Sequence, residues 1–220
     1  MMIPLYIKQF LTTVAHFAMP PFCVQCKKFL AEYTIFCTEC AAQITPIVSV
    51  QLPITVAQSI SVFSISAYQD PIKSLILAKS WRNRLSAQQL GQLIWQKTYS
   101  ANSPFDVIVP VPLHWSRYAW RGYNQAEVIA QELSKLSGKP VVQAVKRIKR
   151  TPFLSSVAPL QRSQLIKAVF ALASKESLHG KHILLVDDVM TTGSTLKAVA
   201  KELLKEKPAA ITAVVAARVC

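Results

Sequence analysis

Glycine is scarce in this 220-residue chain, and its scarcity excludes two common phosphate-binding loops. No two of the five glycines are close enough to form a G-x-G-x-x-G dinucleotide-binding turn. Each of the Gly-Lys pairs, at Gly138 and Gly180, is followed by Pro140 or His182 instead of Ser or Thr, so the sequence contains no Walker A loop. Any phosphate chemistry in this protein must therefore use another kind of turn.

Acidic residues and long apolar runs are also few. Eleven Asp and Glu stand against 25 Lys and Arg, giving a net charge of +14, and the sequence pI is about 9.8. This balance predicts a polyanionic partner such as nucleic acid, anionic lipid or a phosphorylated ligand. The apolar segment 3–19 contains Lys8 and His16 and stops at Pro20, short of the roughly 20 apolar residues of a membrane span. We expect no integral membrane segment, but a one-sided helix that packs on the protein's own core or contacts a membrane surface.

Four of the five cysteines fall in one short stretch with the spacing C-x2-C-x10-C-x2-C: Cys23, Cys26, Cys37 and Cys40. Two such pairs fit a tetrahedral Zn²⁺ ion, since each pair supplies two thiolates. Two disulfides or four reduced thiols are the alternatives, but no secretion signal with an A-x-A site precedes the stretch. We expect a structural zinc site, because four protein thiolates leave no open position for catalysis. Cys220 is expected to be a free thiol.

Apolar segments of strand length alternate with helical segments over most of the chain. Hydrophobic residues make up 51% of the chain and charged residues 16%, which excludes a disordered protein. Strands are predicted in 44–68 and at 105–109, 141–145, 182–186 and 210–217, and helices at 70–79, 86–99, 125–137 and 194–205, with a partly helical 160–173. This order predicts an α/β fold, with a mostly parallel sheet covered by helices on both faces. We expect three parts: an N-terminal helix and zinc ribbon (1–43), a connecting hood (44–100) and an α/β domain (101–220).

The segment 183–195 joins a buried strand to a helix through a polar turn. Asp187 and Asp188 follow four apolar residues, at the strand end where open α/β sheets bind their ligands. The turn Thr191-Thr192-Gly193-Ser194-Thr195 then offers N–H groups, hydroxyls and the positive end of a helix dipole to an anion. Carboxylates next to an anion site fit a ligand that also carries vicinal hydroxyls or Mg²⁺, and a phosphorylated sugar has both features. A Walker-B-like pair and a simple helix cap are the alternatives.

Residues 183–195 resemble, at every position, the phosphoribosyl-pyrophosphate (PRPP) signature of the type I phosphoribosyltransferases. The resemblance implies that Asp187 and Asp188 hold the ribose 2′- and 3′-hydroxyls. It also implies that Thr191, Thr192, Gly193, Ser194 and Thr195 surround the 5′-phosphate, with Mg²⁺ bound alongside PRPP.

A second segment narrows this resemblance. Residues 109–114, followed by Arg117 and by Arg121-Gly122-Tyr123-Asn124-Gln125, resemble the same region of the ComF/GntX family, whose members carry an N-terminal four-cysteine zinc ribbon. The resemblance covers nearly the whole chain and implies a pyrophosphate loop containing His114, Arg117 and Arg121. The alternatives are a solvated basic loop for the two arginines, and helix capping for Asn124 and Gln125.

The chain departs from the family pattern between Thr151 and Phe170. Leu154 stands where the family has Gln and Leu165 where it has Asn, while Arg162 is kept. If this loop recognises the acceptor of a transfer reaction, its recognition is altered. The departure weakens a transferase assignment without affecting the PRPP site.

Basic residues near tryptophans form a candidate nucleic-acid surface. They are Lys146, Arg147, Lys149 and Arg150, together with Arg82 and Arg84 next to Trp81. Such a combination fits single-stranded DNA, to which phosphate attraction and base stacking both contribute. A solvated basic face with tryptophans in the core is the alternative.

Two functional hypotheses follow. The resemblance implies a ComF-like cytoplasmic protein of natural transformation, peripheral to the inner membrane, that works with single-stranded DNA and with an uptake channel or helicase. In this hypothesis the PRPP-type site binds PRPP or a related phosphosugar. The other hypothesis is an active phosphoribosyltransferase that acts on an unidentified amine or nucleobase.

Overall fold

The computed structural model describes residues 22–32, 34–77, 84–98, 104–113, 118, 122–149, 169–173 and 177–219. The chain forms two compact units, Met1–Ile44 and Thr45–Cys220. Within the described residues there is no helix with the length and apolar character that crossing a membrane requires. The predicted helix at 3–19 lies outside the described residues. The predicted three-part division of the chain stays a prediction.

The first unit is built from short segments around the cysteines. An isolated antiparallel bridge pairs Phe22 with Phe29, and helix α2 (Thr38–Ala42) follows Cys37. Leu30, Phe36 and Ile44 are its buried apolar side chains apart from the cysteines, as far as the structure describes the unit. So small an apolar core calls for another source of stability.

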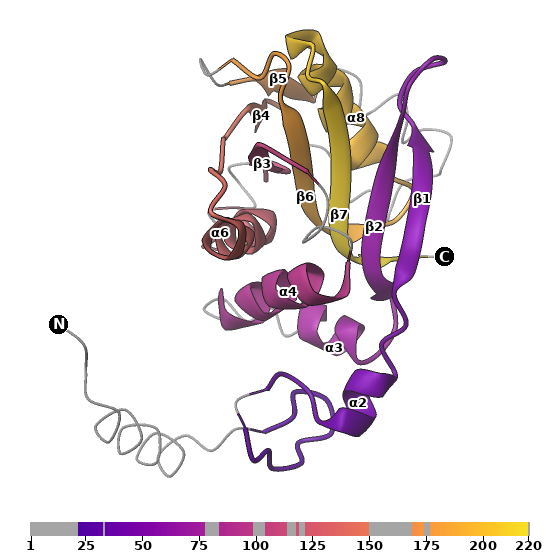
Figure 1. The fold of residues 1–220 in the computed structure, drawn as a ribbon, viewed down its shortest axis with the longest axis vertical. Helices are drawn as coiled ribbons and strands as arrows, with labels where there is room; N and C mark the ends of the chain where they lie inside the picture. The colour runs from indigo at the N-terminus through magenta and orange to yellow at the C-terminus, as the bar shows by residue number, and fades with distance from the viewer. Residues whose placement is uncertain are drawn as a thin grey trace, which may run out of the picture. The chain divides into compact units, whose positions relative to one another are not determined.

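The second unit is organised around a five-stranded sheet with the order β1-β2-β7-β6-β3 (Figure 1). The strands are β1 (Ile47–Pro53), β2 (Ser59–Ala67), β3 (Val107–Pro110), β6 (His182–Met190) and β7 (Ala210–Arg218). β1 pairs antiparallel with β2, and the other three pairings are parallel. The prediction of a mostly parallel sheet is therefore confirmed, and β1 and β2, from the predicted hood, extend this sheet.

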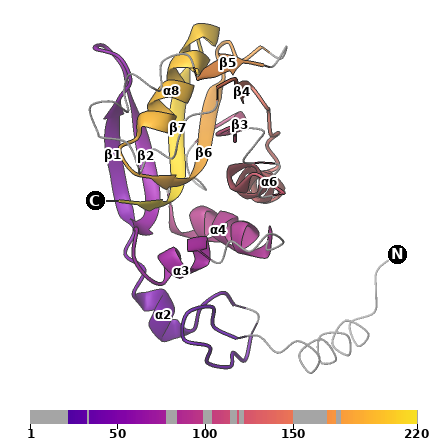
Figure 2. The same ribbon diagram turned by 180° about the vertical axis from the view of Figure 1, so that it is seen from behind.

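Helices cover both faces of the sheet, as predicted. α4 (Arg84–Lys97) packs on β2 and β7, and α6 (Gln125–Ser137) packs on β3 and β6 next to α4. α8 (Ser194–Leu203) lies behind the sheet in Figure 1 and in front of it in Figure 2, where it contacts β6. All four residues of β3 and the run 183–186 of β6 are buried, because layers on both sides exclude water from them.

Strand β6 is longer than the sequence predicts. It continues past Val186 because β7 remains its partner as far as the pair Met190–Arg218. β3, on the other side, stops at the pair Pro110–Val186. Asp187 and Asp188 therefore lie within a strand instead of after it, and among the described residues one side of that strand has no neighbouring strand there.

Other elements agree with the predictions except around the small sheet formed by β4 (Val145–Arg147) and β5 (Phe170–Leu172). Phe170–Leu172, at the end of the segment 160–173 that was predicted to be partly helical, is a strand and the antiparallel partner of β4, while 160–168 lie outside the described residues. The predicted strand 141–145 is reduced to a single bridge between Val141 and Ile108 before β4 begins. α3 (Ile72–Leu77) begins after Asp70, whose Oδ1 accepts a hydrogen bond of 3.1 Å from the backbone N–H of Ser74. A 3-10 turn, η3 (Leu204–Glu206), ends α8.

Candidate functional site

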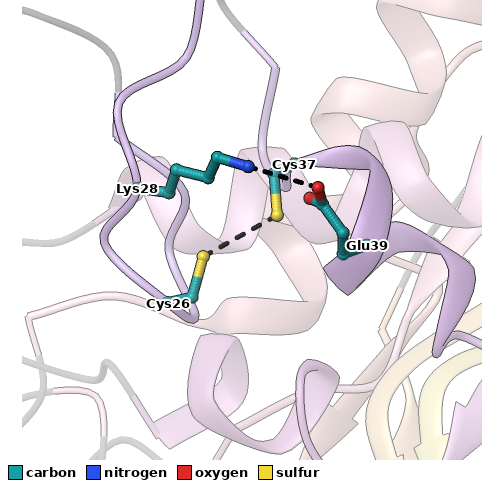
Figure 3. A network of polar contacts seen from close by, with 4 residues as sticks. All are labelled: Cys26, Lys28, Cys37 and Glu39. Carbon is teal, nitrogen blue, oxygen red and sulfur yellow. Dashed lines mark hydrogen bonds and ion pairs between the residues drawn. The ribbon is translucent and has the colours of Figure 1, made fainter.

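The four cysteines of the first unit form one cluster. Their sulfur atoms all lie within 4.8 Å of one another, and the Sγ atoms of Cys26 and Cys37 are 3.7 Å apart (Figure 3). Tetrahedral zinc with Zn–S bonds of about 2.3 Å separates its sulfurs by roughly 3.8 Å, whereas a disulfide needs about 2.05 Å. All four cysteines are free. The cluster therefore fits a zinc ion, and the alternative of two disulfides is wrong.

Neighbouring groups adjust the charge of this cluster. Burial raises the pKa of the Cys40 thiol to about 12. Burial also opposes ionisation of Cys23, but backbone N–H groups that include those of Cys26 and Cys37 outweigh it and lower its pKa to about 6. Lys28 Nζ lies 3.2 Å from Glu39 Oε1 at the rim of the cluster (Figure 3). Because zinc binds thiolates, we expect metal loading to release protons, most of all from Cys40.

In the second unit, a cavity of about 410 Å³ lies beside the part of β6 that extends past β3. We call it the Asp187 cavity. Its lining comes from the segments after β2, β3 and β7, from β4 and the end of β6, from the β6–α8 connection and from the starts of α6 and α8. These residues are Tyr68, Val111, Pro112, Leu113, Asn124, Gln125, Ala126, Arg147, Asp187, Asp188, Val189, Thr191, Thr195 and Val219. The sheet thus has a cavity at the carboxyl ends of its parallel strands, where open α/β sheets bind ligands.

Four residues of the predicted PRPP-binding set line this cavity, namely Asp187, Asp188, Thr191 and Thr195. The carboxylates are partly buried, and Asp187 Oδ1 accepts a hydrogen bond of 2.9 Å from the backbone N–H of Asp188. This bond fixes the orientation of the Asp187 carboxylate on the strand. The side chains therefore place two hydrogen-bond-accepting carboxylates and two hydroxyls around one space.

The turn between β6 and α8 depends on Gly193. Its φ is 72°, in the left-handed region, and an added Cβ would lie 2.7 Å from Leu52 Cδ1 on β1. The turn is closed by a contact of 2.7 Å between the hydroxyls of Thr192 and Ser194. Thr192, Gly193 and Ser194 shape the turn but are not among the residues that line the cavity. Helix α8 begins directly after it, so its positive end lies next to Thr191 and Thr195.

Asn124 joins two walls of the Asp187 cavity. It occupies the N-cap position of α6, yet its side chain makes no capping bond and its Nδ2 donates instead to the carbonyl of Val111 at 3.0 Å. The capping alternative is therefore wrong for Asn124. Gln125 follows as the first residue of α6, and its buried Oε1 has no hydrogen-bond partner among the described residues. A buried amide oxygen beside a cavity favours a ligand that donates a hydrogen bond.

Arg147 was predicted to be part of a nucleic-acid surface, and the structure places it on the wall of the Asp187 cavity. On β4, alternate side chains point to opposite sides, so Arg147 shares the side of buried Val145 while Lys146 is exposed. Its guanidinium carbon lies 5.5 Å from the ring centre of Phe170, the residue paired with it on β5. This cation–π contact holds the guanidinium at the wall of the cavity.

The structure describes only some of the remaining residues that the sequence predicted to be functional. Lys146 and Lys149 are exposed near β4, and Arg84 is exposed at the start of α4. His114, Arg117, Arg121, Arg82 and Arg150 lie outside the described residues, as do Leu154, Arg162 and Leu165. Sequence reasoning missed Gln125 and Arg147 as residues of this cavity. The alternation of Val145 and Arg147 was the signal available for Arg147.

Comparisons with known proteins agree on the family. The sequence profile described as "Phosphoribosyl transferase domain" matches residues 82–220. Competence protein F of Haemophilus influenzae is 31% identical over 194 residues, which cover 84% of this chain and 79% of that protein. DNA utilization protein YhgH of Escherichia coli K12 is 32% identical over 157 residues, 67% of each chain.

Solved structures are more distant. Glutamine PRPP amidotransferase from B. subtilis shares 16% identity over 59% of this chain and 25% of its own, with a TM-score of 0.40. Purine phosphoribosyltransferase from Pyrococcus horikoshii shares 18% identity over 61% of this chain and 82% of its own, with a TM-score of 0.39. The profile match and the sequence relatives suffice: the chain belongs to the phosphoribosyl transferase domain family, and within it to the ComF/GntX family of competence-associated proteins.

Proposed function

We propose that this chain is a ComF-like protein of natural transformation that supports uptake of single-stranded DNA into the cytoplasm and binds Mg-PRPP in the Asp187 cavity. The observation that carries the proposal is the composition of that cavity. Paired carboxylates, the start of a helix and a guanidinium face one space of about 410 Å³. Few ligands other than a phosphorylated sugar need all three groups at once.

Each part of PRPP has a complementary group in this proposal. Asp187 and Asp188 accept hydrogen bonds from the vicinal ribose hydroxyls. The turn from Thr191 to Thr195 binds the 5′-phosphate at the positive end of α8. Arg147, together with Arg117 and Arg121, provides the positive charge that a pyrophosphate requires, and His114 of the same predicted loop donates a hydrogen bond. Mg²⁺ bound together with PRPP would screen the phosphate oxygens from the carboxylates.

The role in transformation rests on the relatives. One is named for competence and another for DNA utilization, and the first covers most of this chain. The net charge of +14 supports a polyanionic partner. We place the protein in the cytoplasm, peripheral to the inner membrane, where an uptake channel or a helicase would deliver the incoming strand.

An active phosphoribosyltransferase is the second candidate, because DNA binding by itself does not require the Asp187–Asp188 pair. In that reaction the bond from ribose C1′ to pyrophosphate breaks while C1′ bonds to a nitrogen of the acceptor, which gives up its proton to water. The departing pyrophosphate keeps the bonding electron pair, and positive groups such as Arg147 stabilise it. Leu154 and Leu165, which replace polar residues of the family, count against an unaltered acceptor site.

Calorimetric titration of Mg-PRPP into the zinc-loaded full chain tests the site. We expect saturable binding that is lost in the double variant Asp187→Asn/Asp188→Asn, since amides accept hydrogen bonds from hydroxyls less strongly and cannot hold the metal-bound ligand. Asp106→Asn is the matched control, because it makes the same change just before β3 at the other end of the sheet, and it should bind normally.

The outcomes separate the candidates. Absence of binding by the wild type, with the fold intact by circular dichroism, would overturn the PRPP site. Equal binding by the double variant would show that PRPP binds elsewhere. If binding occurs, release of pyrophosphate in the presence of amines and nucleobases distinguishes a transferase from a protein that only binds PRPP.

A further inference from the structure

We propose that a hollow at the opposite end of the sheet from the Asp187 cavity binds single-stranded DNA, with a base stacked on Trp95 and the backbone phosphates held by Lys139 and Lys181. We call it the Trp95 hollow. The inference rests on the proposed role in DNA uptake and names the surface that performs it.

The Trp95 hollow lies where α4 and α6 end and β3 and β6 begin. Its volume is about 540 Å³, within the range of roughly 300–1,000 Å³ of ligand pockets, and Trp95, Phe105, Asp106, Lys139 and His182 are among its lining residues. Five residues along β6 separate His182 from Asp187, which at about 3.3 Å per residue is roughly 16 Å. A ligand in this hollow therefore does not occupy the Asp187 cavity, and both sites can be filled together.

The charge of this region favours an anion. Nearly all of the net charge belongs to the second unit: the segment 45–220 contains 22 Lys and Arg and nine Asp and Glu, a net charge of +13. Lys139 lines the hollow, and Lys181 lies between Gly180 and His182, which also line it. Lys207 adjoins them, because its carbonyl accepts a hydrogen bond of 3.1 Å from the N–H of Gly180.

One acidic side chain also lines the hollow. Asp106 Oδ2 accepts a hydrogen bond of 2.8 Å from the backbone N–H of His182, so part of its charge is already compensated by the protein. With three lysines near a single such carboxylate, the local charge stays positive. The Asp187 cavity differs, because two carboxylates lie on its wall.

The aromatic residue favours a single strand over a duplex. Trp95 is half-buried on α4, so part of its indole reaches the hollow while the rest packs on the protein. Only an unpaired base exposes a face for stacking on such a side chain, whereas in a duplex the faces are covered by neighbouring bases. Phosphates on both sides of the stacked nucleotide then meet Lys139 and Lys181.

Fluorescence anisotropy with labelled oligodeoxythymidylate of about 16 nucleotides, near the upper end of site sizes for single-strand binding folds, tests this proposal on the zinc-loaded full chain. Trp95→Leu keeps an apolar side chain but removes the aromatic face, and we expect at least about fivefold weaker binding. Trp95→Phe, which keeps an aromatic face, should retain most of the wild-type affinity. Lys139→Glu/Lys181→Glu should weaken binding at least about tenfold and reduce the slope of log affinity against log salt by about 1.4, for two phosphate contacts.

Lys146→Glu/Lys149→Glu is the matched charge reversal, made on the exposed residues near β4. If this variant loses the oligonucleotide while the Trp95 and Lys139 variants keep it, the Trp95 hollow is excluded and the proposed DNA role stands. If the wild type binds no single strand, the DNA role fails and the inference fails with it. Equal affinity for duplex DNA would also overturn the inference. Titration of Mg-PRPP should give unchanged binding in the hollow variants, which shows that they are folded.

Discussion

The two compact units of this protein are stabilised by different means. The Met1–Ile44 unit has three buried apolar side chains besides its cysteines among its described residues, and four clustered sulfurs. The Thr45–Cys220 unit has a continuous core between its sheet and helices, including Ile183, Leu185 and Val199. The two units also differ in charge. Met1–Ile44 carries three lysines and two acidic residues, whereas the larger unit has a net charge of +13. A cysteine cluster that fits a metal ion thus marks the smaller unit and an apolar core the larger one, and only the larger unit is strongly basic.

The largest expected effect comes from removing zinc. Structural zinc contributes on the order of 10–16 kcal/mol in small zinc-binding folds, far more than three apolar side chains supply. Cys40→Ser, or a chelator, should therefore make residues 22–44 sensitive to protease while the larger unit keeps its circular dichroism spectrum and melting temperature. Limited proteolysis with mass spectrometry measures the first effect, and thermal melting measures the second.

Cys220→Ser is the control for this experiment, because it removes a thiol outside the cluster. It should leave the protease pattern unchanged. Equal loss of stability in both units after zinc removal would contradict the claim that the two units are stabilised by different means. Protection of residues 22–44 in fully metal-free protein would contradict the role of zinc.

The second prediction tests the core of the larger unit with two leucines on one helix. Leu133 of α6 is fully buried and Leu136, three residues later, is 42% exposed. Leu133→Ala should lower the free energy of unfolding by about 2–5 kcal/mol, because it leaves a cavity beneath the helix. Leu136→Ala should cost below about 0.5 kcal/mol. Urea unfolding of the two variants gives the difference, and similar losses for both would show that α6 does not pack as described.

The sequence could predict features whose residues are close together in the chain, but not those that depend on tertiary packing. The cysteine cluster and the turn from Asp187 to Thr195 are each contiguous in sequence, and each contains within itself the residues to which the sequence assigns a binding role. Arg147 and Gln125 reach the Asp187 cavity only through the pairing of β4 with β5 and the packing of α6, which a linear pattern does not contain. Phe170–Leu172 shows the same limit, since its partner on β4 decides its structure over local propensity.

The extension of β6 is a further case. Apolar residues predicted its start and its buried part, but its end depends on β7, which continues as a partner to Met190 after β3 has stopped. That difference in strand length exposes one side of Asp187 and Asp188 to the cavity. The sequence singled out these carboxylates and the structure places them on the wall of a cavity, but their ligand-binding role stays a prediction. The reason for their accessibility lies in the neighbouring strands.

The smallest expected effect concerns Gly193, where stability and the proposed phosphate site depend on one residue. Gly193 and Gly138 share a φ of 72°, so an alanine at either costs about 1–2 kcal/mol of backbone strain. An added Cβ at Gly138 meets nothing within 4 Å, whereas at Gly193 it meets Leu52 at 2.7 Å. Gly193→Ala should therefore destabilise more than Gly138→Ala in urea unfolding, and only Gly193→Ala should weaken Mg-PRPP binding. If Leu52→Ala restores the additional stability lost in Gly193→Ala, that loss comes from the contact with Leu52, since the smaller side chain leaves room for the new Cβ. Equal losses of stability in the two glycine variants would show that the contact is relieved without cost.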